Sequence, residues 1–241
     1  QQAHTTAENS LFMKCFLNGV VIRSAFQRLL CNLYGVYSAL EEAMIAHQED
    51  PIVGPMVFPE LWRRENLAAD LAFYFGQTWQ TDWPSQVTDT GQAYVSRIHQ
   101  IAQENPALVV AHSYVRYLGD LSGGQGLRAI ARKALDLPPD QGTGLHDFDR
   151  LPTPEAKQAF KQRYRDALNG LPVSSELAQA LVLEAQRAFH LNCAVMASLD
   201  GDVVLAIDPV LLQQVQRENR PGSTEAQAAS AVHASLAQGA A

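Results

Sequence analysis

Long hydrophobic runs are absent from this 241-residue chain. No apolar stretch reaches the roughly 18–20 uncharged residues that a membrane-crossing helix needs. No signal-peptide pattern opens the sequence, and no hydrophobic anchor closes it. We therefore expect a soluble protein with no membrane partner.

Cysteine is scarce, and basic residues are outnumbered by acidic ones. Cys15, Cys31 and Cys193 are far apart and have apolar neighbours, which predicts buried thiols in a reducing compartment. Disulfides and a cysteine-based zinc site are therefore not expected. The 18 lysines and arginines against 25 acidic residues give a net charge of −7, which argues against nucleic acid as a partner.

Strand-like alternation of apolar and polar residues is missing, so we predict an all-α protein of about eight helices. Residues 1–205 are expected to form one domain. The tail, 206–241, is expected to hold a short helix at 208–217 and then to be disordered from 221. Helices are expected at about 1–17, 22–47, 61–75, 90–104, 106–135, 155–168 and 175–199, with loops at 81–89 and 138–154.

Histidines are present, but not in a di-iron pattern. A four-helix carboxylate site needs Glu-x-x-His, and no glutamate here has a histidine three residues later. Only His4, His112 and His190 stand out among the seven histidines. Glu8 lies one helical turn after His4 and could accept a hydrogen bond from the ring nitrogen that does not face a ligand. Taken alone, His4 is better explained as a structural histidine.

The most unusual stretch is a helix interrupted by Gly119, Gly123, Gly124 and Gly126. Each glycine costs a helix interior about 1 kcal/mol relative to alanine. At 100° per residue, positions 119, 123 and 126 share one face. A tight helix crossing would explain one or two of them, whereas four glycines beside Asp120 favour a broad, flat ligand. The helical periodicity before Gly124 excludes a dinucleotide-binding strand–turn–helix, and the P-loop lysine is missing.

Seven sequence blocks, in order, resemble the heme oxygenase family. The resemblance covers about residues 3–200, and the block at 114–125 is highly specific. The blocks are A-H-T-T-A-E-N at 3–9, N-L-Y-G-V-Y-S-A-L-E-E at 32–42, F-P-E-L at 58–61, Y-V-R-Y-L-G-D-L-S-G-G-Q at 114–125, K-A-L-D-L-P at 133–138, F-K-Q-R-Y-R at 160–165 and A-F-H-L-N at 188–192.

The resemblance implies a helical sandwich that holds heme, both substrate and cofactor, between a proximal and a glycine-kinked distal helix. His4 would bind the heme iron, with Glu8 behind it. Gly119 and Gly123, with Gly124 also in contact with the cofactor, would leave room for little beyond dioxygen.

The polar residues of the distal side have implied roles in proton delivery. Asp120 would pass a proton through ordered water to heme-bound dioxygen, and Arg116 and Tyr37 would anchor that water. From the residues alone, an Arg116–Asp120 ion pair one turn apart explains Asp120 as well, and both descriptions can hold together.

Other implied contacts hold the ring. Lys161 and Arg165, in a basic stripe with Lys157, would pair with the heme propionates, and Tyr114 would add a polar contact. The remaining pocket residues would be Phe189, as a wall of the pocket, and Asn192, as a hydrogen-bonding group.

The implied reaction is cleavage of heme at the α-meso carbon to biliverdin, carbon monoxide and ferrous iron. The blocks at 39–42 and 58–61 look closest to photosynthetic relatives. This implies ferredoxin or a similar acidic electron donor, phycobilin synthesis with a downstream bilin reductase, and a cytoplasmic or plastid-stroma location. Docking is expected at Arg128, Arg132, Lys133 and the 157–165 stripe.

Two other functions remain open. One is a non-catalytic heme carrier on the same scaffold, against which Asp120 argues. The other is a thiaminase-like enzyme, which needs a pocket cysteine nucleophile that the three cysteines do not provide in sequence.

Overall fold

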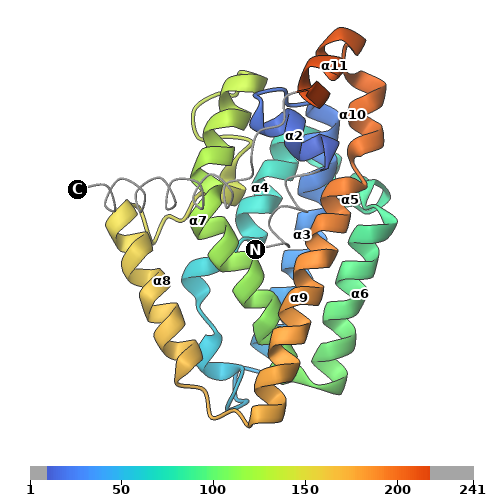
Figure 1. The fold of residues 1–241 in the computed structure, drawn as a ribbon. Coiled ribbons are helices and arrows are strands. Elements are labelled where there is room, and N and C mark those ends of the chain that lie inside the picture. The colour runs from blue at the N-terminus through green and yellow to red at the C-terminus, as the bar shows by residue number, and fades with distance from the viewer. Residues whose placement is uncertain (1–9, 218–241) are drawn as a thin grey trace, which may run out of the picture.

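The computed structural model describes residues 10–217, and within this range every regular element is a helix, as predicted (Figure 1). Short 3-10 helices, labelled η, join several of the α-helices. The elements are α2 (Leu11–Leu17), α3 (Arg23–Ala46), η1 (Gly54–Met56), η2 (Pro59–Leu61), α4 (Arg64–Phe75), η3 (Gly76–Thr78), α5 (Trp79–Gln86), α6 (Asp89–Glu104), η4 (Pro106–Leu108), α7 (Val109–Leu135), η5 (Gly144–His146), α8 (Pro154–Asn169), α9 (Ser175–Ala197), α10 (Asp200–Ala206) and α11 (Pro209–Arg217).

Helix starts follow from local sequence. A serine or threonine side chain accepts the backbone N–H three residues on, which satisfies a donor that the first turn leaves free. The residues that do so are Ser10 for α2, Thr88 for α6, Thr153 for α8 and Ser174 for α9. The N-termini of these four helices are therefore fixed by single polar residues.

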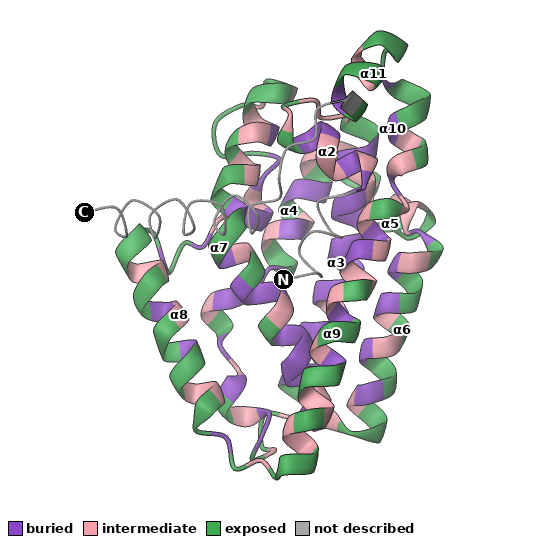
Figure 2. Ribbon diagram, viewed as in Figure 1, coloured by how far each residue is buried: buried purple, intermediate pink, exposed green. Residues whose placement is uncertain are grey.

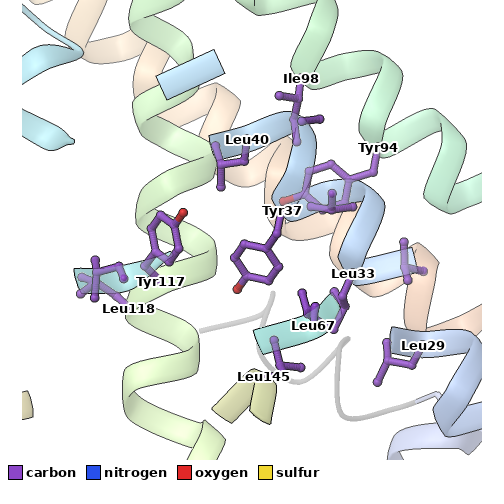
Figure 3. Close-up of a cluster of buried hydrophobic side chains, with 14 of the residues drawn as sticks. Leu29, Leu33, Tyr37, Leu40, Leu67, Tyr94, Ile98, Tyr117, Leu118 and Leu145 are labelled. Atoms are coloured by element: carbon purple, nitrogen blue, oxygen red, sulfur yellow. The ribbon is translucent and has the colours of Figure 1, made fainter. Parts of the chain in front are cut away.

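Helix α3 forms the centre of the molecule and is buried along most of its length (Figure 2). It packs against α4, α6 and α7. In Figure 3, Leu33, Tyr37 and Leu40 cluster with side chains from neighbouring elements, including Tyr94 and Tyr117. Because Tyr37 is fully buried in this cluster, its hydroxyl is held in a fixed position.

The prediction of a loop at residues 81–89 is wrong, because α5 covers most of it despite Pro84. The rings of Trp79 and Trp83, one turn apart, both pack edge-on against Tyr34, with centroids 5.3 and 4.9 Å away. Aromatic packing of this kind stabilises a pair by about 1 kcal/mol. The helix ends two residues after the proline, so tertiary contacts outweigh the local breaker.

The predicted helix at 208–217 is confirmed as α11. Both α10 and α11 contact α2, and Ile207 and Val215 are buried. In addition, Asp200 accepts the backbone N–H of Phe12 at 2.8 Å. The chain as far as α11 therefore packs on the helical body.

One helical stretch, Ser175–Ala206, is long and apolar enough by length and composition to cross a membrane. Charged residues interrupt it at Glu184, Arg187 and Asp200, so it is not the uncharged run that a membrane-crossing helix was expected to need. A core helix of a soluble protein passes the same test, and α9 contacts α6 and α7. Its Glu184 is buried and pairs with Arg97, which is the behaviour of a core helix.

Candidate functional site

Helix α7 presents one face of bare backbone. Gly119, Gly123 and Gly126 are exposed, and no heavy atom of the described chain lies within 4 Å of a Cβ placed on any of them. A flat group can therefore approach the helix backbone closely here. This is the opening that the three-residue glycine face predicts.

Gly124 lies on a different side of α7. It is buried, and a Cβ placed there would lie 2.9 Å from Nδ1 of His146 in η5. Gly124 thus packs against His146, whereas the backbone at Gly119 and Gly123 is open. The sequence grouped Gly124 with the cofactor-binding glycines, and the structure gives it a role in helix–loop packing.

A cluster of four polar side chains lies beside the open glycines. The Tyr37 hydroxyl from α3 donates to Oδ2 of Asp120, and Nη2 of Arg116 lies 3.3 Å from its Oδ1. Nε of Arg116 donates to the Tyr37 oxygen at 3.3 Å, and its Nη1 donates to Oδ1 of Asn192 on α9. Three helices thus bring together four residues that were each singled out from the sequence. The Arg116–Asp120 ion pair is present too.

Burial shapes the electrostatics of this cluster. It raises the pKa of the Asp120 carboxyl well above its ordinary value. It also lowers the pKa of the Arg116 guanidinium. Desolvation disfavours the charged form of each group, so Asp120 is adapted to hold a proton closer to neutral pH than an exposed aspartate.

A second buried network was only partly visible in the sequence. Nε2 of His112 lies 2.9 Å from Oε1 of Glu184, whose Oε2 pairs with Nη2 of Arg97 at 2.6 Å. The Tyr94 ring lies 5.5 Å from the His112 ring. His112 attracted attention because it lies near the glycine face. Arg97 and Glu184 carried no signal, since each is one charge on a separate amphipathic helix.

The pKa of Glu184 reflects these contacts. Burial alone raises it, but the hydrogen bonds from His112 and Arg97 outweigh burial and hold the pKa at about 2. Glu184 is therefore a carboxylate near neutral pH and ties α9 to α6 and α7.

The basic stripe lies on α8, beside the face of this helix that packs on the protein. Phe160 and Tyr164 are buried under Phe58, with ring centroids 5.4 Å apart in both pairs. Within residues 10–217, no side-chain hydrogen bond or ion pair is formed by the stripe residues, which are Lys157, Lys161 and Arg165. These cations are therefore available to a ligand or partner.

Tyr114 connects the stripe to α7. Its side chain is 40% exposed, and its ring centroid lies 6.5 Å from that of Tyr164. Ser113, the residue before it, bonds the Tyr164 hydroxyl at 2.7 Å. Helix α8 is thus attached to α7 at the level of Tyr114, two residues before Arg116.

Three expected site residues lie outside the polar cluster and the basic stripe. His4 and Glu8 lie outside the described residues. Phe189 lies on α9, three residues before Asn192, and is partly exposed.

The described residues fit a flat, anionic macrocycle. The open glycine face would accept its plane, the unpaired cations of α8 would accept its carboxylates, and the buried carboxyl of Asp120 would lie at its side. Fold and site together define an all-helical protein built to bind and chemically modify such a ring.

Comparisons with known proteins give the family. The heme oxygenase family model matches residues 1–198. The chain is 48% identical over 226 residues to heme oxygenase 2 of Synechocystis, covering 94% of this chain and 90% of the relative. It is 44% identical over 200 residues to human heme oxygenase 1, covering 83% and 68%. The chain belongs to the heme oxygenase family.

Solved structures agree with this assignment. The crystal structure of Synechocystis heme oxygenase-2 in complex with heme and NO matches with a TM-score of 0.89 and 48% identity, covering 93% of this chain and 91% of that one. Heme oxygenase-1 from the same organism, in complex with heme, gives a TM-score of 0.82 and 42% identity, covering 89% and 94%. The helical sandwich predicted from the sequence is therefore confirmed.

Proposed function

We propose that this protein opens heme at the α-meso carbon with O2 and external electrons, yielding biliverdin, carbon monoxide and ferrous iron. Bound heme supplies the site at which O2 is activated. The observation that carries the proposal is the Tyr37–Arg116–Asp120–Asn192 cluster placed beside the open backbone of α7. A carrier needs the open face but has no use for a largely buried carboxyl held by two partners, Tyr37 and Arg116.

The cluster divides the work of proton delivery. Asp120 holds the proton at a carboxyl oxygen, and burial keeps its pKa raised. The Tyr37 hydroxyl and the Arg116 guanidinium fix the direction of that carboxyl. Asn192 holds Arg116 in turn. A positioned general acid of this kind contributes roughly 10²–10⁴-fold in rate.

Binding and orientation of heme fall to other residues. His4, supported by Glu8, is proposed as the iron ligand. Lys161 and Arg165 would pair with the propionates, whose position fixes the rotation of the ring and hence the edge that is attacked. Tyr114 and Phe189 are proposed as further pocket contacts. Gly119 and Gly123 exclude side-chain bulk from the distal side.

The electron donor is proposed to be ferredoxin or a similarly acidic protein. Of the basic residues first considered, Arg128 pairs with Asp147 at 2.9 Å, and Arg132 donates to the Pro138 carbonyl at 2.8 Å. Both are therefore held by the loop after α7. Lys133 is exposed and, with Lys157 and the rest of the α8 stripe, is better placed to attract an acidic partner.

A place in bilin synthesis follows from the product. Biliverdin is an open-chain tetrapyrrole, so a bilin reductase would consume it, in the cytoplasm or in a plastid stroma.

The test is an absorption titration with hemin, followed by addition of reduced ferredoxin and its reductase in air. We expect a saturable Soret band that is lost during turnover while a verdin spectrum rises in the red. Chromatography of the product should give the α isomer. A Soret band that persists through reduction and oxygen would instead support the carrier.

A further inference from the structure

The closed side of α7 rests on η5. A Cβ placed on Gly124 would lie 2.9 Å from Nδ1, 3.6 Å from Cγ and 3.8 Å from Cβ of His146. Ordinary carbon contacts begin near 3.4 Å, so an added methyl group would force a movement of about half an ångström. The ring of His146 is therefore in direct contact with the helix backbone.

His146 has little freedom to move away. Its side chain is 5% exposed, and its carbonyl accepts from Nε2 of Gln125 at 2.9 Å. The Asp70 carboxylate of α4 accepts the backbone N–H groups of Gly144 and Leu145 at 2.7 and 2.8 Å. These bonds fix the backbone of η5 on both sides of the ring.

The residue after His146 adds two more attachments. Asp147 pairs with Arg128 of α7, and its carbonyl accepts from the buried Arg63. The loop is thus held by α4, by the segment before α4 and by α7 at once. Burial, together with Arg116, Arg128 and Arg63, lowers the pKa of His146 to about 3, so the ring packs as a neutral group.

We propose that His146 is a positioning residue for the distal side: its ring against the bare Cα of Gly124 sets how far α7 stands from the protein interior. Gly123, the residue immediately before Gly124, belongs to the open face. A displacement of α7 at Gly124 is therefore transmitted to the gap in which heme is bound. This inference rests on the proposed function, because the gap matters only if heme occupies it.

The test is a set of four variants: Gly124→Ala, His146→Ala, the double variant, and Gly201→Ala as control. Gly201 lies in α10, and no described heavy atom is near its Cβ position, so it reports the general effect of replacing a helical glycine. Three quantities are measured: the unfolding midpoint without hemin, the dissociation constant of hemin, and the pH midpoint of the optical water–hydroxide transition of the ferric complex.

We expect Gly124→Ala to weaken hemin binding about ten-fold and to displace the pH midpoint, since a misplacement of about 1 Å near a reacting site is costly. The double variant should return both values to within about two-fold of wild type, because removing the ring restores the space. His146→Ala alone should displace the pH midpoint while hemin still binds. Gly201→Ala should raise only the unfolding midpoint.

Several outcomes would overturn the inference. One is a Gly124→Ala protein that behaves like Gly201→Ala, and another is a double variant no better than Gly124→Ala. If Gly124→Ala does not fold, a folded double variant still supports the contact, and a double variant that also fails to fold contradicts it. The unfolding series needs no hemin, so it tests the contact even if wild-type protein does not bind hemin and the proposed function fails.

Discussion

The chemistry proposed for this site depends on a few polar groups that are largely removed from water. Asp120 and Arg116 would each cost several kcal/mol if buried alone. They are retained together because Tyr37 and Asn192 supply additional hydrogen bonds. Such an arrangement contributes little net stability, which indicates that it is kept for its reactivity.

Glu184 allows a pH prediction at the same scale. Its folded pKa of about 2 lies below the ordinary 4.5, so it stabilises the fold above pH 4.5, and this contribution is lost as pH falls toward 2. Glu184→Gln should therefore unfold about 1–2 kcal/mol more easily at pH 7, after allowance for solvent screening.

Denaturant unfolding of the two proteins between pH 7 and pH 3 measures this difference, which should shrink as the pH falls below 4.5. The control is Glu155→Gln, an exposed glutamate on α8. A Glu184→Gln defect that stays constant over the whole range would contradict the account.

Sequence reasoning singled out the residues that are proposed to react, but it did not find every residue that packs behind them. Tyr37, Arg116, Asp120 and Asn192 lie in specific blocks of the family resemblance, and the structure brings them together. The pairing of Glu184 with Arg97 could not be predicted, because helical periodicity says which face a residue occupies and not which distant helix packs on it.

At the scale of elements, the proposed function of α7 depends on the missing side chains of its glycine face. Gly119→Leu would place a branched side chain over the open backbone, and we expect the hemin dissociation constant to rise at least ten-fold, about 1.4 kcal/mol. Ala129→Leu, on an exposed position of the same helix, serves as control. Optical titration with hemin measures both variants, and equal affinities in the two would show that the glycine face is not where heme binds.

The element boundaries show which helices cannot be predicted from local sequence alone. Caps and prolines predicted most helix positions, but α5 forms through the contacts of Trp79 and Trp83 with Tyr34, which no local pattern reveals. Likewise, helical spacing sets Gly124 apart from the face of Gly119 and Gly123, but it does not show what Gly124 packs against. Only the structure shows that Gly124 faces His146 of η5.

On the scale of the whole molecule, charge is unevenly distributed. The protein carries a net charge of −7, yet the basic stripe of α8 forms no ion pair with any other residue of 10–217. Lys133→Glu combined with Lys157→Glu should raise the KM for reduced ferredoxin about five-fold and weaken its salt dependence, because electrostatic steering toward an acidic partner is lost.

Hemin affinity should change little in this double variant, since neither residue is assigned to the propionates. Lys14→Glu on α2 is the control for a charge reversal on another helix. Steady-state turnover at several salt concentrations gives the answer. An unchanged KM would show that the electron donor docks elsewhere on the surface.

The most direct test of the central claim is a single-turnover comparison of wild type with Asp120→Asn, both loaded with one equivalent of hemin and reduced in air. Asparagine keeps an oxygen for the Tyr37 hydroxyl but cannot hold the proton. Asp136→Asn, at the left-handed end of α7, removes an equal charge outside the site. We predict unchanged hemin binding in all three and a biliverdin yield at least ten-fold lower in Asp120→Asn alone. A normal biliverdin yield from Asp120→Asn would contradict the assignment of proton delivery to this cluster.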